Sequence, residues 1–262
     1  DFFQGLLMFA ALLVVLIAAT VKIGGVSQIT ENLREIPRFT DLFGIATPVD
    51  AKGAIVSAAA GNEQAVVNGK GVFGSGANYG FLSILSCLAW GLGYFGMPQV
   101  LLRFMAINKS SELRRSRVIA TTWCVISLFA AVAIGMIGQA LLPGLLRTSG
   151  ASENIFIHMS VDFFPPLFAG IVLSGILAAS MSSSDSYMLI ASSAVSKNII
   201  GGLFMKKASE KTIMWTARIS LLVLTIFGIF VATSGNDSIF RIVSYAWAGF
   251  GAAFGPLILF SL

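Results

Sequence analysis

Charge is scarce in this chain, and so are the residues on which common catalytic centres depend. Charged residues make up 11% of the 262 positions, whereas soluble domains carry about 25%. There is one histidine, His158, and the two cysteines, Cys87 and Cys124, both lie within apolar runs. No Ser-His-Asp set, HExxH helix, Walker loop or cysteine pair can be assembled from the sequence. We therefore expect neither an enzyme nor a disulfide-stabilised scaffold.

Apolar residues make up 56% of the chain and gather in six stretches long enough to cross a bilayer. A spanning helix needs about 20 mainly apolar residues. The qualifying stretches cover residues 2–23, 79–105, 118–142, 164–194, 213–233 and 239–262. The sequence predicts an all-α membrane protein in contact with lipid, with about six transmembrane helices in one transmembrane domain over residues 1–262. An apolar run begins almost at Asp1, with no initiator methionine, so we expect a piece of a longer protein.

Lysine and arginine are concentrated at two junctions between spans, residues 103–117 and 197–218. Basic residues favour the cytoplasmic ends of spans. We therefore expect both loops to be cytoplasmic in a multi-pass protein of the inner (plasma) membrane. The basic charge then reflects topology, and we expect no nucleic-acid partner.

Residues 24–78 form a long connection that this count places outside the membrane. Ile29, Leu33 and Ile36 share one helical face, and Pro37 should end such a helix at that point. Residues 51–76 are rich in Ala, Gly and Asn, which predicts a flexible loop.

The fourth span contains the densest polar cluster, between residues 178 and 187. Helical spacing places four of its small residues on one stripe, namely Ala179, Ser182, Ser183 and Ser186. Hydroxyl and main-chain oxygens on one face offer the ligands that a small hard cation such as sodium requires. The alternative is that these serines pack helices closely and bond back to the preceding turn.

Asp185 lies at the edge of this stripe and is the only acid well inside a span. A charge in the membrane costs several kcal/mol and is a functional hypothesis by default. The carboxyl group could bind a cation, relay protons or bond neighbouring hydroxyls as a neutral acid.

The second span is interrupted by the run WGLGYFGMP over residues 90–98. Three glycines and a proline make a continuous helix improbable, and broken helices at mid-membrane can bind substrates and ions. Trp90 and Tyr94 lie one helical turn apart and would face one site together. The alternative is a kinked packing helix with its aromatic residues toward lipid. A further run, residues 246–256, pairs Gly251 with Gly255, which predicts close helix packing.

Four segments together resemble the sodium:solute symporter family, and within it the sodium/proline symporters. They read DFFQGLLM (1–8), WGLGYFGMPQVLLRFMA (90–106), LAASMSSSDSYMLIASSA (177–194) and AWAGFGAAFGP (246–256). The resemblance implies part of a LeuT-like inverted-repeat core (APC-type), with sites at the midplane. The chain would supply the last helix of the first repeat and all, or nearly all, of the second.

The resemblance also implies roles for individual residues. The main-chain oxygen of Ala179, with Ser182 and Ser183, would bind the coupling ion Na⁺. A second cation site would involve Asp1, Asp185 and Ser186, and proline would be bound by Trp90, Tyr94 and Pro98. Met97 and Gln99 depart from the polar pair Gln and His common in proline carriers.

We therefore expect sodium-coupled import of a small solute, with L-proline as the first candidate, by alternating access. Three rivals stay open at this point. One is a symporter of the same family for another amino acid, a carboxylate or a sugar. The others are a symporter-like sensor domain of a signalling kinase and a proton-coupled carrier that uses Asp185.

Overall fold

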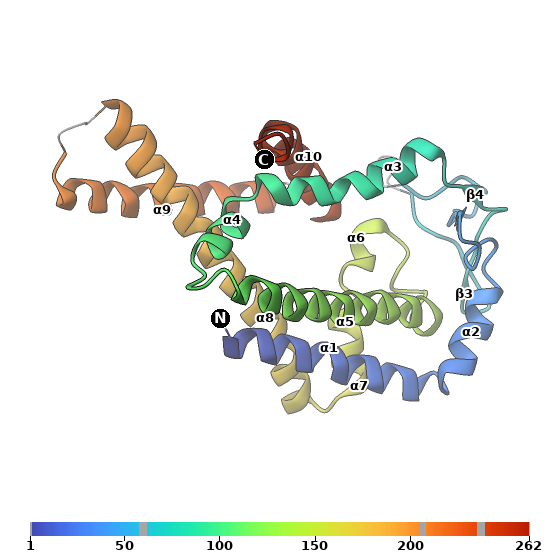
Figure 1. Cartoon of the computed structure of the whole chain (residues 1–262). Coiled ribbons are helices and arrows are strands. Elements are labelled where there is room, and N and C mark those ends of the chain that lie inside the picture. The colour runs from blue at the N-terminus through green and yellow to red at the C-terminus, as the bar shows by residue number, and fades with distance from the viewer. Residues whose placement is uncertain (1, 58–61, 205–207, 235–238, 262) are drawn as a thin grey trace.

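The computed structural model describes residues 2–57, 62–204, 208–234 and 239–261, and most of these are helical (Figure 1). In these ranges five helices are long and apolar enough to cross a membrane. They are α1 (Phe2–Lys22), α5 (Glu112–Leu141), α8 (Pro166–Ser193) with its continuation, α9 (Glu210–Ser234) and α10 (Ile239–Leu259). The continuation of α8 is a π-helical segment, η2 (Ala194–Phe204), which runs beyond the predicted end of the fourth span. The predicted all-α membrane architecture is confirmed in this form.

The remaining predicted span, residues 79–105, is three short helices instead of one. They are α3 (Phe81–Ala89), the 3₁₀-helix η1 (Trp90–Gly96) and α4 (Pro98–Met105). Met97 between η1 and α4 has extended backbone angles (φ −89°, ψ 110°). The predicted interruption is confirmed, because glycine weakens the helix and Pro98 begins a new one. The described residues therefore contain five continuous spans, one fewer than the six that the sequence predicted.

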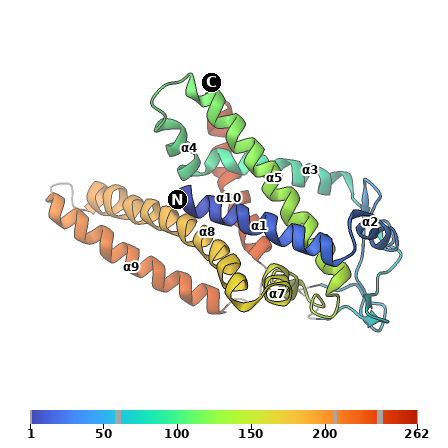
Figure 2. The same ribbon diagram turned by 90° about the horizontal axis from the view of Figure 1, so that it is seen from below.

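The best-packed part of the molecule lies where α1 is enclosed by α5, α7 (Ile155–Phe163) and α8 (Figure 2). Val15 and Ala19 of α1, Ile137 of α5 and Met159 of α7 are fully or almost fully buried there. These side chains form one continuous apolar cluster. Their burial removes apolar surface from water or lipid and fixes the positions of three of the long helices.

The helix α7 and the single turn α6 (Ser149–Ser152) lie between α5 and α8 and were not expected from the sequence. Ile155 and Met159, four residues apart, both face the core. That spacing is a helical signal, but the segment is too short to be found by a search for spans.

The connection between α1 and α3 contains more structure than the predicted flexible loop. It holds α2 (Val26–Arg34) and two small antiparallel pairs, β1 (Gly44–Ile45) with β4 (Ala77–Asn78), and β2 (Val66–Val67) with β3 (Lys70–Gly71). The short helix before Pro37 is thus confirmed.

A two-residue turn, Asn68-Gly69, joins β2 to β3. Both residues have positive φ angles, 51° and 75°. Asn-Gly is the sequence most typical of such hairpin turns, so the signal for this hairpin was present in the chain.

Candidate functional site

The serine cluster lies on α8 as one continuous helix, as the sequence predicted. Ala179, Ser182 and Ser186 are half-buried, whereas Ser183 and Asp185 are exposed among the described residues. The hydroxyl of Ser186 donates to the main-chain oxygen of Ser182 at 3.2 Å. Such a bond to the preceding turn is what the packing alternative predicts. The same bond also brings a hydroxyl and a carbonyl oxygen together, as oxygen ligation of a cation requires.

The helices α1 and α8 run antiparallel and touch closely. A Cβ atom on Gly175 would lie 3.0 Å from the Cβ of Ala11 and 3.1 Å from the main-chain oxygen of Leu7. At the other end of α1, the Lys22 ammonium lies 5.0 Å from the ring centroid of Phe163, just before α8. The first turn of α1 therefore points along α8 toward the serine cluster (Figure 2). Asp1, expected at the second cation site, lies outside the described residues.

Two aromatic residues of η1, Trp90 and Tyr94, lie around one side chain of α10. The Trp247 ring centroid lies 5.6 Å from that of Tyr94, edge to face, and 6.4 Å from that of Trp90. Trp90 also contacts Phe240 at 5.2 Å. Trp90 and Tyr94 thus share a neighbour, Trp247, which the sequence analysis did not single out although it lies in the quoted 246–256 run.

Trp247 also carries an unusual polar atom. Its indole Nε1 is buried and has no hydrogen-bond partner in the described ranges. Buried polar groups in proteins are nearly always paired, and a lone one costs about 1–3 kcal/mol. The aromatic cluster therefore holds one hydrogen-bond donor that the described residues leave unused.

Glycines allow η1 and α10 to approach one another at backbone distance. A Cβ on Gly93 would lie 2.5 Å from Cδ1 of Trp247, and one on Gly96 would collide with the carbonyl group of Phe250. From the other side, a Cβ on Gly251 would lie 3.3 Å from the amide nitrogen of Gly93. The close packing predicted for the 246–256 run is present, and its partner is the broken helix.

The helix α4 begins at Pro98, one residue after η1 ends, and contacts α8. Pro98 therefore lies close to the aromatic cluster along the chain. In the described part of the chain no group of three or more His, Cys, Asp or Glu residues could hold a metal ion. A cation at α8 would accordingly rely on hydroxyl and main-chain oxygens.

A model of the sodium:solute symporter family matches residues 1–262. The chain belongs to this family. The chain is 38% identical to the osmoregulated proline transporter OpuE of Bacillus subtilis, over 100% of the chain and 47% of the relative. It is 36% identical to the high-affinity proline transporter PutP of Bacillus subtilis, over 100% of the chain and 49% of the relative. With the sodium/proline symporter of Escherichia coli it shares 41% identity, over 70% of the chain and 37% of the relative.

The chain thus spans about half the length of these curated relatives. No solved structure matches it. Membership of a family of transporters agrees with the expectation that the protein is not an enzyme, and its long apolar helices mark it as a multi-pass membrane protein.

Proposed function

We propose that this chain is part of a sodium-coupled symporter that imports L-proline across the inner membrane by alternating access. The observation that carries the proposal is the broken helix at Trp90–Gly96, whose aromatic residues meet a buried, unpaired indole N–H. Irregular backbone is tolerated at membrane depth where it is buried in protein or lines a cavity, and transporters place their substrate sites at such breaks. The names of the relatives supply the solute.

The aromatic cluster suits proline for a chemical reason. The rings of Trp90 and Tyr94 offer apolar faces to the pyrrolidine ring and π-electrons to its cationic nitrogen. The Nε1–H of Trp247 is a donor for the proline carboxylate. Pro98 borders the same site by position. Met97 is almost fully buried beside it and supplies an adaptable apolar wall.

Sodium would be coordinated on α8 by the Ala179 main-chain oxygen with the hydroxyls of Ser182 and Ser183. A second cation would lie between Asp1, Asp185 and Ser186. Sodium bound there would hold α8 against neighbouring helices and favour the outward-open state. Its electrochemical gradient then drives import, because the ion binds the two states with different affinity.

The proposal includes a LeuT-like core, in which α1 ends the first repeat and the following helices form the second. In this orientation loops 103–117 and 197–218 are cytoplasmic and residues 24–78 lie outside. The inner-membrane assignment follows from the same placement.

The test of the sodium site uses the full-length protein with Ser182→Ala or Ser183→Ala. Removing a ligand to a charged group costs about 1.5–3 kcal/mol, so we expect the half-saturating sodium concentration for proline uptake to rise roughly tenfold or more. Ser174→Ala is the matched control, because its hydroxyl bonds back to Gly170 on the same helix at 2.7 Å. Unchanged sodium dependence in both variants would contradict the site assignment.

The test of the substrate site is separate. Trp90→Ala and Tyr94→Ala should raise the KM for proline more than they change the sodium requirement, because both rings contact the substrate and neither would ligate the ion. Competition of labelled proline uptake by other amino acids, carboxylates and sugars then identifies the solute. A weaker dependence on sodium with unaltered proline KM would count against this assignment.

A further inference from the structure

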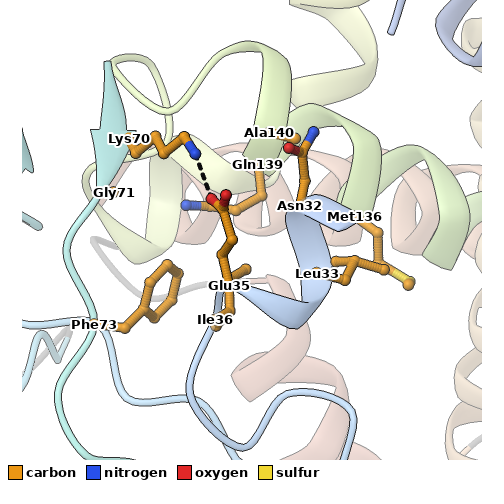
Figure 3. A pocket seen from close by; sticks show the side chains of 10 residues that line it. All are labelled: Asn32, Leu33, Glu35, Ile36, Lys70, Gly71, Phe73, Met136, Gln139 and Ala140. Carbon is orange, nitrogen blue, oxygen red and sulfur yellow. Dashed lines mark hydrogen bonds and ion pairs between the residues drawn. The ribbon is translucent and has the colours of Figure 1, made fainter. Parts of the chain in front are cut away.

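A cavity of about 120 Å³ lies between α2, β3 and the end of α5, away from α8 and η1 (Figure 3). One wall is apolar, formed by Leu33 of α2, Phe73 after β3 and Met136 of α5. Four polar side chains complete it, namely Asn32 and Glu35 of the α2 segment, Lys70 of β3 and Gln139 of α5. The residues that the proposed transport site requires take no part in this cavity.

The polar side chains present both signs of charge next to one another. The Lys70 ammonium is ion-paired with Oε2 of Glu35, as Figure 3 shows. This pair uses one of the two carboxylate oxygens, and an ammonium has three N–H donors. The two side chains are 66% and 52% exposed. Each group can therefore take a second partner without the ion pair being broken.

Gln139 adds a donor that lacks a partner. Its amide Nε2 is buried and makes no hydrogen bond within the described residues. A donor left unpaired in this way costs about 1–3 kcal/mol. An ion pair that merely tied the β2–β3 hairpin to α2 would not require an unpaired amide in the same cavity.

We propose that this cavity is a binding site for a small zwitterion such as an amino acid or betaine. The ligand carboxylate accepts from Lys70 and, once the Gln139 side chain turns toward the cavity, from its amide Nε2. The cationic nitrogen of the ligand lies against Glu35, and its aliphatic part packs on the apolar wall. The size follows from the volume, because a cavity of about 150 Å³ holds benzene. An ion of one sign meets one attractive and one repulsive charge, whereas a zwitterion complements both.

The experiment uses the full-length protein in lipid nanodiscs with Cys87 and Cys124 replaced by serine. Ala140→Cys places a thiol in the lining of the cavity, and its rate of alkylation is measured with and without glycine betaine or L-proline. A ligand at about ten times its Kd should slow labelling about tenfold by occupancy. Acetate and tetramethylammonium, which carry one charge each, should not protect.

Two variants assign the protection to this cavity. Lys70→Met and Glu35→Gln should each abolish it, whereas Lys52→Met, in the same connection but outside the cavity, should leave it intact. Trp90→Ala in the same background should raise the KM for proline transport and leave protection unchanged, which separates this site from the proposed transport site. Calorimetric titration of the Trp90→Ala protein with glycine betaine should also detect binding, and it needs no reporter thiol.

Three results would overturn the proposal. One is the absence of both protection and a calorimetric signal for either zwitterion. Another is equal protection by acetate, and the last is protection that survives Lys70→Met and Glu35→Gln. If transport fails the sodium and proline tests while zwitterions still protect Ala140→Cys, the proposed function falls and this site stands.

Discussion

Replacing Gly96 by alanine tests whether the broken helix is positioned by its contact with α10. The new Cβ atom would collide with the carbonyl oxygen of Phe250 and lie 2.8 Å from its carbonyl carbon and 3.0 Å from its Cβ. Carbon atoms in good contact lie about 3.5–4.0 Å apart. A carbonyl group in a helix cannot turn away as a side chain can, so η1 itself must move away from α10.

The cost can be worked out from opposing effects. Extra atoms in a well-packed interior cost about 1–3 kcal/mol, and alanine returns up to about 1 kcal/mol because glycine loses more chain entropy on folding. We expect a net loss of about 1–2 kcal/mol and a fall in melting temperature of roughly 2–8 °C. Proline affinity should fall as well, since the displacement separates Tyr94 from Trp247.

Gly91→Ala is the matched control, because a Cβ at that position in the same 3₁₀-helix would meet no atom within 4 Å. Both full-length variants are purified and unfolded thermally with a thiol-reactive dye, and proline binding is measured on the same samples. Gly91→Ala should melt at or slightly above the temperature of the parent protein. If Gly96→Ala melts at no lower a temperature than Gly91→Ala, then η1 and α10 are not in close backbone contact at Gly96.

Two further outcomes are expected elsewhere in the fold. Gly138→Ala should destabilise the protein by about 1–3 kcal/mol, because its Cβ would overlap Ile155. Gly135→Ala on the same helix is the control, because its Cβ would meet nothing within 4 Å. Equal melting temperatures of the two variants would refute the packing of α5 on α7. The pKa of Asp50 is lowered from 3.8, first by the hydrogen bond from the Ala54 amide. A lowered folded-state pKa gives stability that is fully present above the ordinary value and lost as the pH falls through the folded-state pKa. Amide hydrogen exchange at Ala54 should therefore accelerate, relative to intrinsic rates, only below about pH 4, and loss of protection already at pH 6 would exclude Asp50 as the cause.

The break in the second span could be predicted because its causes are local. Glycine and proline act on their own stretch of chain, and the pair Trp90 and Tyr94 is read from spacing alone. Which helix covers the break could not be predicted. Gly251 indicates a close neighbour, but the glycine spacing does not identify that neighbour as η1, which lies more than 150 residues earlier in the chain. Trp247 was missed for the same reason, since its importance comes from a contact between distant segments.

The serine cluster of α8 could be located from the sequence, but its role could not be predicted. Its stripe of small polar residues was placed correctly on α8, and the bond from Ser186 to Ser182 agrees with both interpretations of it. Hydroxyls that pack helices and hydroxyls that ligate sodium have the same spacing, so sequence cannot choose between them. The core helix α7 was missed because a search for spans overlooks short helices packed against long ones.

The continuation of α8 into η2 makes this helix a long arm. Its 39 residues span about 58 Å at about 1.5 Å per residue, more than the roughly 40–45 Å of a whole bilayer. The arm must therefore tilt or project from the membrane. Because the serine cluster lies near its middle, a small rotation there is amplified at the far end. A spin label on the segment carrying Lys197 would report such a rotation when sodium binds.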